Sequence, residues 1–179
     1  AQYWAWKNAD ADYYGFFHYR RYLSFAKEQF DADPFGEVHA PCNDDAALQK
    51  YGIDEARIRE TVAKYDLVVP QEGGFPARGL TLYRQYCIAP VHHKRDLDFV
   101  LNVLREDYPA MYPYAKRYLR RKKGYFCNMF IMKKALFEEY SAWLFSILKK
   151  HEDAVDIANY SEQAMRVHGF LAERLCGIF

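Results

Sequence analysis

Histidine, arginine and tyrosine crowd into one short segment, and these side chains can bind an anion or accept a proton. The segment reads HYRRY at residues 18–22 and follows an apolar half that begins at Tyr14. The apolar half predicts a short buried strand. Cations at the end of an interior strand are typical of anion-binding sites in open α/β folds. An ordinary strand-to-loop junction with solvated arginines explains the same residues equally well.

The two adjacent arginines suit a phosphate group in particular. Arginine binds phosphate through two parallel hydrogen bonds and needs no metal to do so. If the segment is extended, alternation sends His18 and Arg20 to one side and Tyr19 and Arg21 to the other. We therefore expect His18 and one arginine to line a ligand pocket, and the other arginine to brace the fold.

The sequence does not support a divalent metal site. Asp10-Ala11-Asp12 has the spelling of a metal-binding Asp-x-Asp motif, but it precedes the expected strand instead of following it, so it predicts a turn. His92 and His93 are adjacent, and adjacent residues diverge on a helix. The four cysteines lack zinc-ligand spacing and are read as reduced thiols of a cytoplasmic protein.

Composition limits the remaining possibilities. A chain of 179 residues is long enough for one domain with a real core. Aromatic residues make up 18%, which fits ligand stacking but fits a large core first. A net charge of +1 gives no global basic field, so nucleic-acid binding is not expected. No run approaches the roughly 20 apolar residues that cross a bilayer.

Charge is nevertheless uneven along the chain. Residues 116–123 hold six cations in eight positions and no acidic residue. Such a run fits an anionic membrane surface or a polyanionic substrate, and a solvated helix end fits it at least as well.

Periodicity and turn residues predict an α/β layer fold with short buried strands. A long loop is expected over residues 25–47 and a Gly/Pro turn over residues 71–78. The expected strands are residues 13–18, 66–70 and 126–132. The expected helices are residues 1–8, 53–64 with Asp54 as N-cap, 80–86, 94–106, 134–150 and 161–175.

Four blocks in order across the chain carry a resemblance to a known family. They are WAWKN at 4–8 with Gly15 and HYRRY at 18–22, NMFIM at 128–132, Tyr140 with WLF at 143–145, and Arg166 with GFL and ERL at 169–175. With these blocks the sequence resembles a bacterial family of capsular and exopolysaccharide glycosyltransferases, first catalogued as a domain of unknown function. His168 departs from the pattern, which more often has an aromatic residue there.

The resemblance implies a GT-A-like, Rossmann-like fold of three layers, with a short mixed sheet flanked by helices. Residues 1–179 would form one glycosyltransferase domain. Family members normally carry a further region before the tryptophan block, so the resemblance implies that this chain is the C-terminal portion of a larger GT-A-like domain.

The implied reaction moves a hexosyl unit, with galactofuranosyl as the first guess, from a nucleotide-diphosphate sugar such as a UDP-sugar. The acceptor would be a glycan or lipid-linked glycan of capsule, O-antigen or exopolysaccharide biosynthesis. No covalently bound cofactor is implied. The reaction would take place in the cytoplasm, with peripheral contact to the inner membrane face. A non-catalytic glycan-binding or scaffolding module of a larger synthase is the competing interpretation.

Within this resemblance, Glu173 and His18 are the candidate catalytic residues. Glu173 suits a general base, and a surface or capping ion pair with Arg174 explains it equally well. Asn128 would bind sugar hydroxyls or hold a neighbouring loop, because a buried amide needs partners. Asp96 and His93 are weaker candidates for the base. The expected donor- or acceptor-binding residues are Arg20, Arg21, Tyr19, Asn128, Arg166, Arg174 and Trp6.

Overall fold

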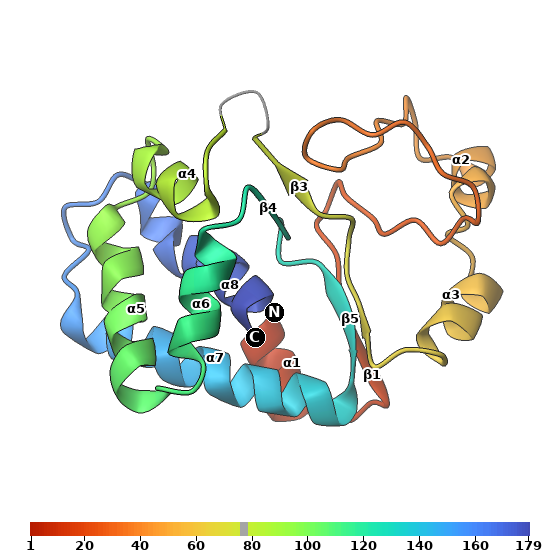
Figure 1. Cartoon of the computed structure of the whole chain (residues 1–179). Helices are drawn as coiled ribbons and strands as arrows, with labels where there is room; N and C mark the ends of the chain where they lie inside the picture. The colour runs from red at the N-terminus through yellow and green to blue at the C-terminus, as the bar shows by residue number, and fades with distance from the viewer. Residues whose placement is uncertain (76–78) are drawn as a thin grey trace.

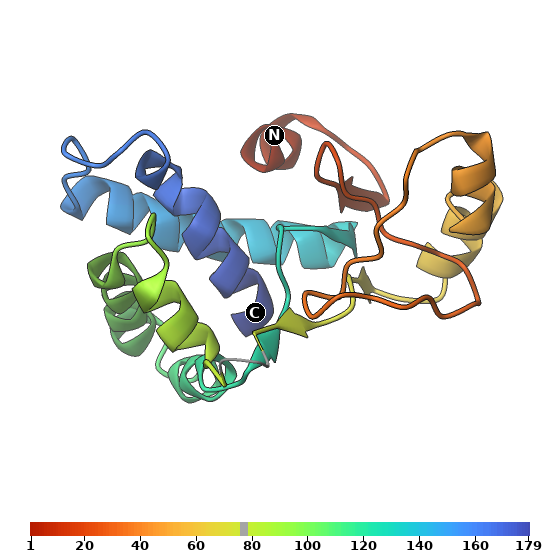
Figure 2. The same ribbon diagram turned by 90° about the horizontal axis from the view of Figure 1, so that it is seen from above.

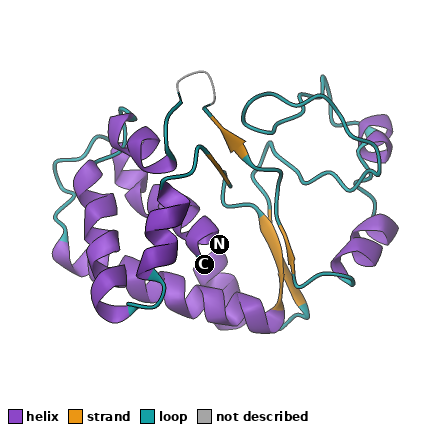
Figure 3. Ribbon diagram, in the orientation of Figure 1, coloured by secondary structure: helices purple, strands orange, loops and turns teal. Residues whose placement is uncertain are grey.

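The computed structural model describes residues 1–75 and 79–179, and most of its regular structure is helical (Figures 1 and 3). The short 3-10 helix η2 (Ala164–Arg166) leads directly into the last α-helix. The α-helices are α1 (Gln2–Asn8), α2 (Asp45–Lys50), α3 (Glu55–Val62), α4 (Leu82–Ile88), α5 (Lys94–Asp107), α6 (Tyr112–Leu119), α7 (Lys134–Ala154) and α8 (Val167–Ile178).

A small antiparallel sheet joins distant parts of the chain. Strand β5 (Phe130–Lys133) lies between β1 (Tyr13–Phe16) and β2 (Leu67–Val68), and Met132 is opposite both Tyr14 and Leu67. A separate antiparallel pair joins β3 (Gly73–Gly74) to β4 (Lys123–Gly124). The predicted mixed sheet is therefore wrong for the described residues, because β5 runs opposite to both of its neighbours.

Strand β5 is buried on both faces, which explains its uninterrupted apolar sequence. Phe130 and Met132 belong to the large hydrophobic core, whereas Ile131 belongs to a smaller cluster with Leu23 and Val62. This alternation is the two-residue period of a strand. Figure 1 shows the same division, with α4 to α8 on one side of the sheet and α2 and α3 on the other.

The long helix α7 supplies the centre of the large core. Phe137, Tyr140, Leu144 and Ile147 are fully buried, as their helical spacing predicted. The ring of Phe137 stacks on Tyr14 with centroids 4.1 Å apart. The aromatic excess of the sequence therefore serves mainly to fill the core, as expected.

Several boundaries differ from the prediction. The first strand ends at Phe16 instead of residue 18, and the third begins at Phe130 instead of residue 126. Cys127 and Asn128 interrupt the expected strand because both have positive φ angles, 73° and 51°. Helix α2 was not predicted, whereas α3 begins after the expected N-cap Asp54. Residues 76–78 of the expected turn lie outside the described residues.

Helix α6 approaches α8 most closely at Gly177. A Cβ atom at Gly177 would overlap the hydroxyl of Tyr118, so glycine permits the two helices to approach. The Tyr118 hydroxyl also accepts a hydrogen bond from the backbone N–H of Tyr125, at 3.1 Å. Among the described helices, none combines the length and the apolar character that crossing a membrane requires.

Candidate functional site

The segment at residues 18–21 forms a tight turn. The backbone N–H of Arg21 donates a hydrogen bond to the carbonyl of His18 at 3.1 Å. The predicted extended alternation of these four residues is therefore wrong, because the β1 ladder ends at Phe16 and the chain reverses. Tyr19 and Arg20 occupy the two corner positions. Tyr19 is 72% exposed, and the Arg20 guanidinium lies 4.7 Å from the centre of its ring.

The two arginines of the turn differ in their partners. Arg21 Nε donates to Glu37 Oε1 at 2.7 Å, which ties the turn to the long loop that follows it. Arg20 is exposed and forms no ion pair with the residues that the structure describes. Arg21 therefore has a structural contact of the bracing kind, and the expected ligand role of the other arginine stays a prediction.

His18 lies among cations and is partly buried. Its ring centre is 4.5 Å from that of Tyr19, and its Nδ1 is buried without a hydrogen-bond partner in residues 1–75 and 79–179. Burial, followed by the charges of Arg21, Arg20 and Arg166, lowers the pKa of His18 below its ordinary value of 6.5. At neutral pH the imidazole is therefore uncharged and able to accept a proton.

The irregular residues before β5 are held by α8. Glu173 Oε2 accepts a hydrogen bond of 2.6 Å from the backbone N–H of Cys127. The Asn128 Nδ2 donates to the carbonyl of Gly169 at 3.0 Å. Asparagine tolerates a left-handed backbone better than cysteine does, so the backbone strain is greater at Cys127. The hydrogen bond from Cys127 to Glu173 helps to hold the chain in that conformation. Of the two roles open to Asn128, the structure shows the loop-holding contact.

Arg174 is an internal residue, with 1% of its surface exposed. Its Nη1 donates to Glu173 Oε1 at 2.7 Å, and its Nη2 donates to Gln85 Oε1. Its guanidinium carbon lies 5.1 Å from the ring centre of Phe126. The structure thus gives Arg174 internal partners in place of the ligand-facing position expected from the sequence. Both oxygens of Glu173 are engaged, so the ion-pair interpretation of Glu173 is the one that the contacts show.

Three of the sequence blocks, HYRRY, NMFIM and the start of α8, lie near one another. The charge of Arg166, an exposed residue at the end of η2, acts on His18. The charge of Arg21 likewise acts on the Cys127 thiol, whose pKa burial raises. Hydrogen bonds join the loop before β5 to α8, and the charges of Arg21 and Arg166 relate the turn after β1 to these two segments. We call the candidate residues of these segments the site cluster, and it consists of His18, Tyr19, Arg20, Arg21, Asn128, Arg166 and Glu173.

Trp6 does not join the site cluster through any of its described contacts. Its ring stacks on Phe145 of α7 with centroids 5.7 Å apart, and Lys7 Nζ lies 3.3 Å from its centre. The opening tryptophan block thus attaches α1 to α7. The contacts shown for Trp6 are packing contacts, and its ligand role stays a prediction.

One group that could hold a divalent cation was not anticipated from the sequence. Asp33, Glu37 and His39 bring ligand atoms within 4.8 Å of one another. Asp33 Oδ2 and His39 Nε2 are 3.0 Å apart, and Glu37 also pairs with Arg21. The only sequence signal was the acidic, histidine-containing part of the long loop. Asp10, by contrast, pairs with Lys134 at 2.5 Å.

His92 and His93 contact different neighbours, although they precede α5 instead of lying on a helix as the prediction assumed. His92 lies between Tyr86 and Phe170, with ring centroids at 4.3 Å and 4.4 Å. The His93 ring lies 4.0 Å from that of Tyr160, whose hydroxyl donates to Asp96. Asp96 is fully buried, so it and His93 belong to a polar group at the start of α5 instead of the site cluster.

The burial of His92 predicts a pH-dependent stability. Burial, with a smaller contribution from Arg174, lowers the pKa of His92 from 6.5 to about 4. Between these values the unfolded chain binds more protons, so the free energy of unfolding falls as the pH falls. Replacing His92 with phenylalanine should reduce this decline by roughly 2 kcal/mol. Urea unfolding of both proteins at pH 7 and at pH 4 measures the difference, and equal declines would refute the assignment.

Comparison with known proteins places the chain in a family. All of residues 1–179 match the family model described as "Domain of unknown function (DUF4422)". The chain belongs to this family. Among curated proteins, none matches the chain. The residue blocks that indicated a family first catalogued as a domain of unknown function are therefore consistent with the DUF4422 match.

One solved structure resembles the chain closely. The bifunctional glycosyltransferase WbbM, in its apo form, matches with a TM-score of 0.92 and 39% sequence identity. The match covers 99% of this chain and 32% of WbbM. The chain thus spans about a third of the length of that protein.

Proposed function

We propose that this DUF4422 chain is a glycosyltransferase. The observation that carries the proposal is the likeness to WbbM, at 39% identity over 99% of the chain. Following the sequence resemblance, we further propose a GT-A-like domain that transfers a hexosyl unit, with galactofuranosyl as the first candidate. The donor would be a UDP-sugar in the cytoplasm, and the acceptor a glycan or lipid-linked glycan of a bacterial surface polysaccharide.

The site cluster supplies groups that such a reaction needs. Charge develops on the nucleotide diphosphate as it leaves, and fixed cations stabilise that charge. Arg20 and Arg166 are exposed cations without ion pairs among the described residues, and we assign the diphosphate to them. Tyr19 offers an exposed ring beside Arg20 for a sugar or base.

A base is needed if the acceptor hydroxyl loses its proton to the protein. His18 suits this task because burial and the neighbouring arginines lower its pKa, which leaves the imidazole uncharged at neutral pH. Glu173 is bound to Arg174 and to the Cys127 backbone, so we assign it to holding the loop before β5.

The role of Arg20 can be tested by donor binding. Replacing Arg20 with glutamine should weaken UDP binding about 10-fold to 100-fold, because it removes a charged hydrogen-bonding partner of the diphosphate. Isothermal titration calorimetry with UDP measures the change. Arg105→Gln is the matched control, since Arg105 is an exposed helical arginine on α5. Unchanged affinity in the Arg20 variant would contradict the assignment.

The same preparation separates an enzyme from a glycan-binding module. Hydrolysis or transfer from a UDP-sugar supports the glycosyltransferase. Glycan binding without donor binding would instead support a non-catalytic module of a larger synthase.

A further inference from the structure

A cluster of cations on and after α6 has no role in the proposed site. Arg121 pairs with Glu72 at 2.6 Å. The neighbouring cations form no ion pair with the described residues, and they are Lys116, Arg117, Arg120, Lys122 and Lys123. Every one of these neighbours is exposed. We call them, together with two tyrosines, the α6 basic surface, and it consists of Tyr112, Tyr114, Lys116, Arg117, Arg120, Lys122 and Lys123.

The amphipathic character of α6 gathers this charge on one side. Ala115, Tyr118 and Leu119 are buried against the core, so the cations between them must face outward. No acidic residue occurs in residues 111–123. The positive charge is therefore not neutralised within the segment, although the whole chain is nearly neutral.

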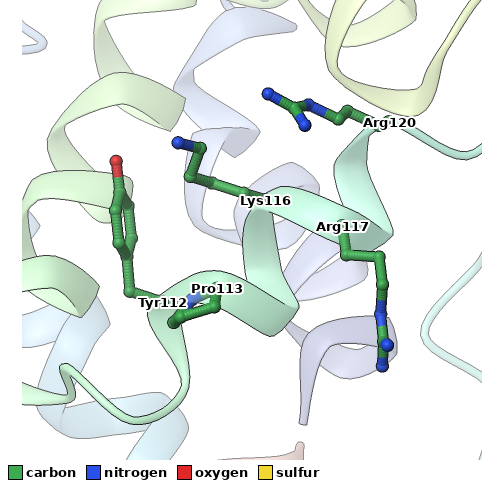
Figure 4. A pocket seen from close by; sticks show the side chains of 5 residues that line it. All are labelled: Tyr112, Pro113, Lys116, Arg117 and Arg120. Atoms are coloured by element: carbon green, nitrogen blue, oxygen red, sulfur yellow. The ribbon is translucent and has the colours of Figure 1, made fainter.

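The α6 basic surface is hollowed and partly aromatic. An open hollow of about 500 Å³ is lined by Tyr112, Pro113, Lys116, Arg117 and Arg120 (Figure 4). Figure 4 shows Tyr112, Lys116 and Arg120 extending toward one another, whereas Arg117 points away from them.

Exposed tyrosine accompanies the cations. Tyr114 is 58% exposed, and the Arg117 guanidinium lies 5.2 Å from its ring centre. Lys116 Nζ lies 5.5 Å from the ring centre of Tyr112. Tyrosine beside lysine and arginine is the combination found at the headgroup level of membranes, where rings and long side chains have one apolar and one polar end.

We propose that the α6 basic surface docks the protein on a membrane that contains anionic phospholipids. Phosphate headgroups complement these five exposed cations, and the hollow lined by Tyr112, Lys116 and Arg120 offers a headgroup two of the charges. In Figure 2, α6 lies on the side of the molecule opposite α1. Nucleic acid fits less well, because the charge ends within one short helix and the following turn, and the net charge is only +1.

Vesicle binding tests this proposal without any assumption about catalysis. The protein should sediment with phosphatidylcholine vesicles containing about a third phosphatidylglycerol, and not with vesicles of phosphatidylcholine alone. The triple variant K116Q/R117Q/R120Q should lower the partition coefficient roughly 100-fold, or about fivefold for each cation removed. Salt at about 0.5 M should weaken wild-type binding similarly.

A matched variant controls for total charge. K50Q/R59Q/K64Q also removes three positive charges, but from exposed positions on and near α2 and α3. It should bind within about twofold of wild type. Circular dichroism checks that both variants are folded. Equal losses in the two variants, or no wild-type binding to anionic vesicles, would overturn the proposal. Binding of single-stranded RNA through the same three residues, without vesicle binding, would also overturn it.

Discussion

Replacing Arg174 with methionine should lower the free energy of unfolding by about 3 kcal/mol. Arg174 is almost completely buried and holds Glu173 and Gln85 through charged hydrogen bonds. Methionine fills much of the same volume, but it leaves the Glu173 carboxylate without its cation. Because Glu173 retains some exposure to water, we expect the lower end of the range of about 3 to 5 kcal/mol for broken buried pairs. Urea unfolding measures the loss.

Arg166→Met is the matched control, since Arg166 is an exposed arginine just before α8. It should change the free energy of unfolding by less than about 0.5 kcal/mol. The double variant R174M/E173Q removes the unpaired charge and should recover part of the lost stability. A loss below about 1 kcal/mol in the Arg174 variant would mean that its ion pair contributes no more than a surface pair.

Replacing His18 with glutamine should lower kcat by about 10²-fold to 10⁴-fold, the usual contribution of a general base. This expectation rests on the proposed glycosyltransferase activity and on the position of His18 beside Arg20 and Arg21. The surrounding arginines and burial lower its pKa, so the base is available throughout neutral pH. The wild-type kcat/KM should therefore stay level at neutral pH and fall only below pH 6.5, as His18 becomes protonated.

Two controls separate a base from a merely structural residue. Lys27→Gln changes an exposed residue in the neighbouring loop and should keep kcat within about threefold of wild type. The His18 variant should also keep its affinity for UDP, because the diphosphate is assigned to arginines. A kcat loss below tenfold, or an unchanged acid limb of the pH profile, would contradict the assignment of the base.

The core was predictable because its signals are local. Phe137, Tyr140, Leu144 and Ile147 recur at helical spacing, and all four are buried along α7 as that spacing requires. The continuous apolar run around Ile131 also indicated a strand with two buried faces. In both cases the spacing of the buried residues follows from the backbone geometry, which turns about every 3.6 residues in a helix and alternates every two residues in a strand.

The site was predictable only in part, because its geometry depends on distant contacts. The four residues from His18 to Arg21 alternate in any extended model, and only the early end of β1 shows that they turn. The burial of Arg174 depends on Gln85, a partner that no local spacing reveals. The positive φ angles of Cys127 and Asn128 likewise depend on acceptors supplied by α8.

The pairing of β1 with β5 has a consequence for the order in which the chain folds. Helices α5 to α8 lie within residues 94–178 and pack together, so most of the large core closes shorter loops than the pairing of β1 with β5 does. The site cluster, however, needs residues 13–16 to find residues 130–133 and so close a very long loop. Closing long loops is slow, because the entropy is lost before the contacts form. We therefore expect a helical intermediate to acquire its core first and its ligand-binding ability last.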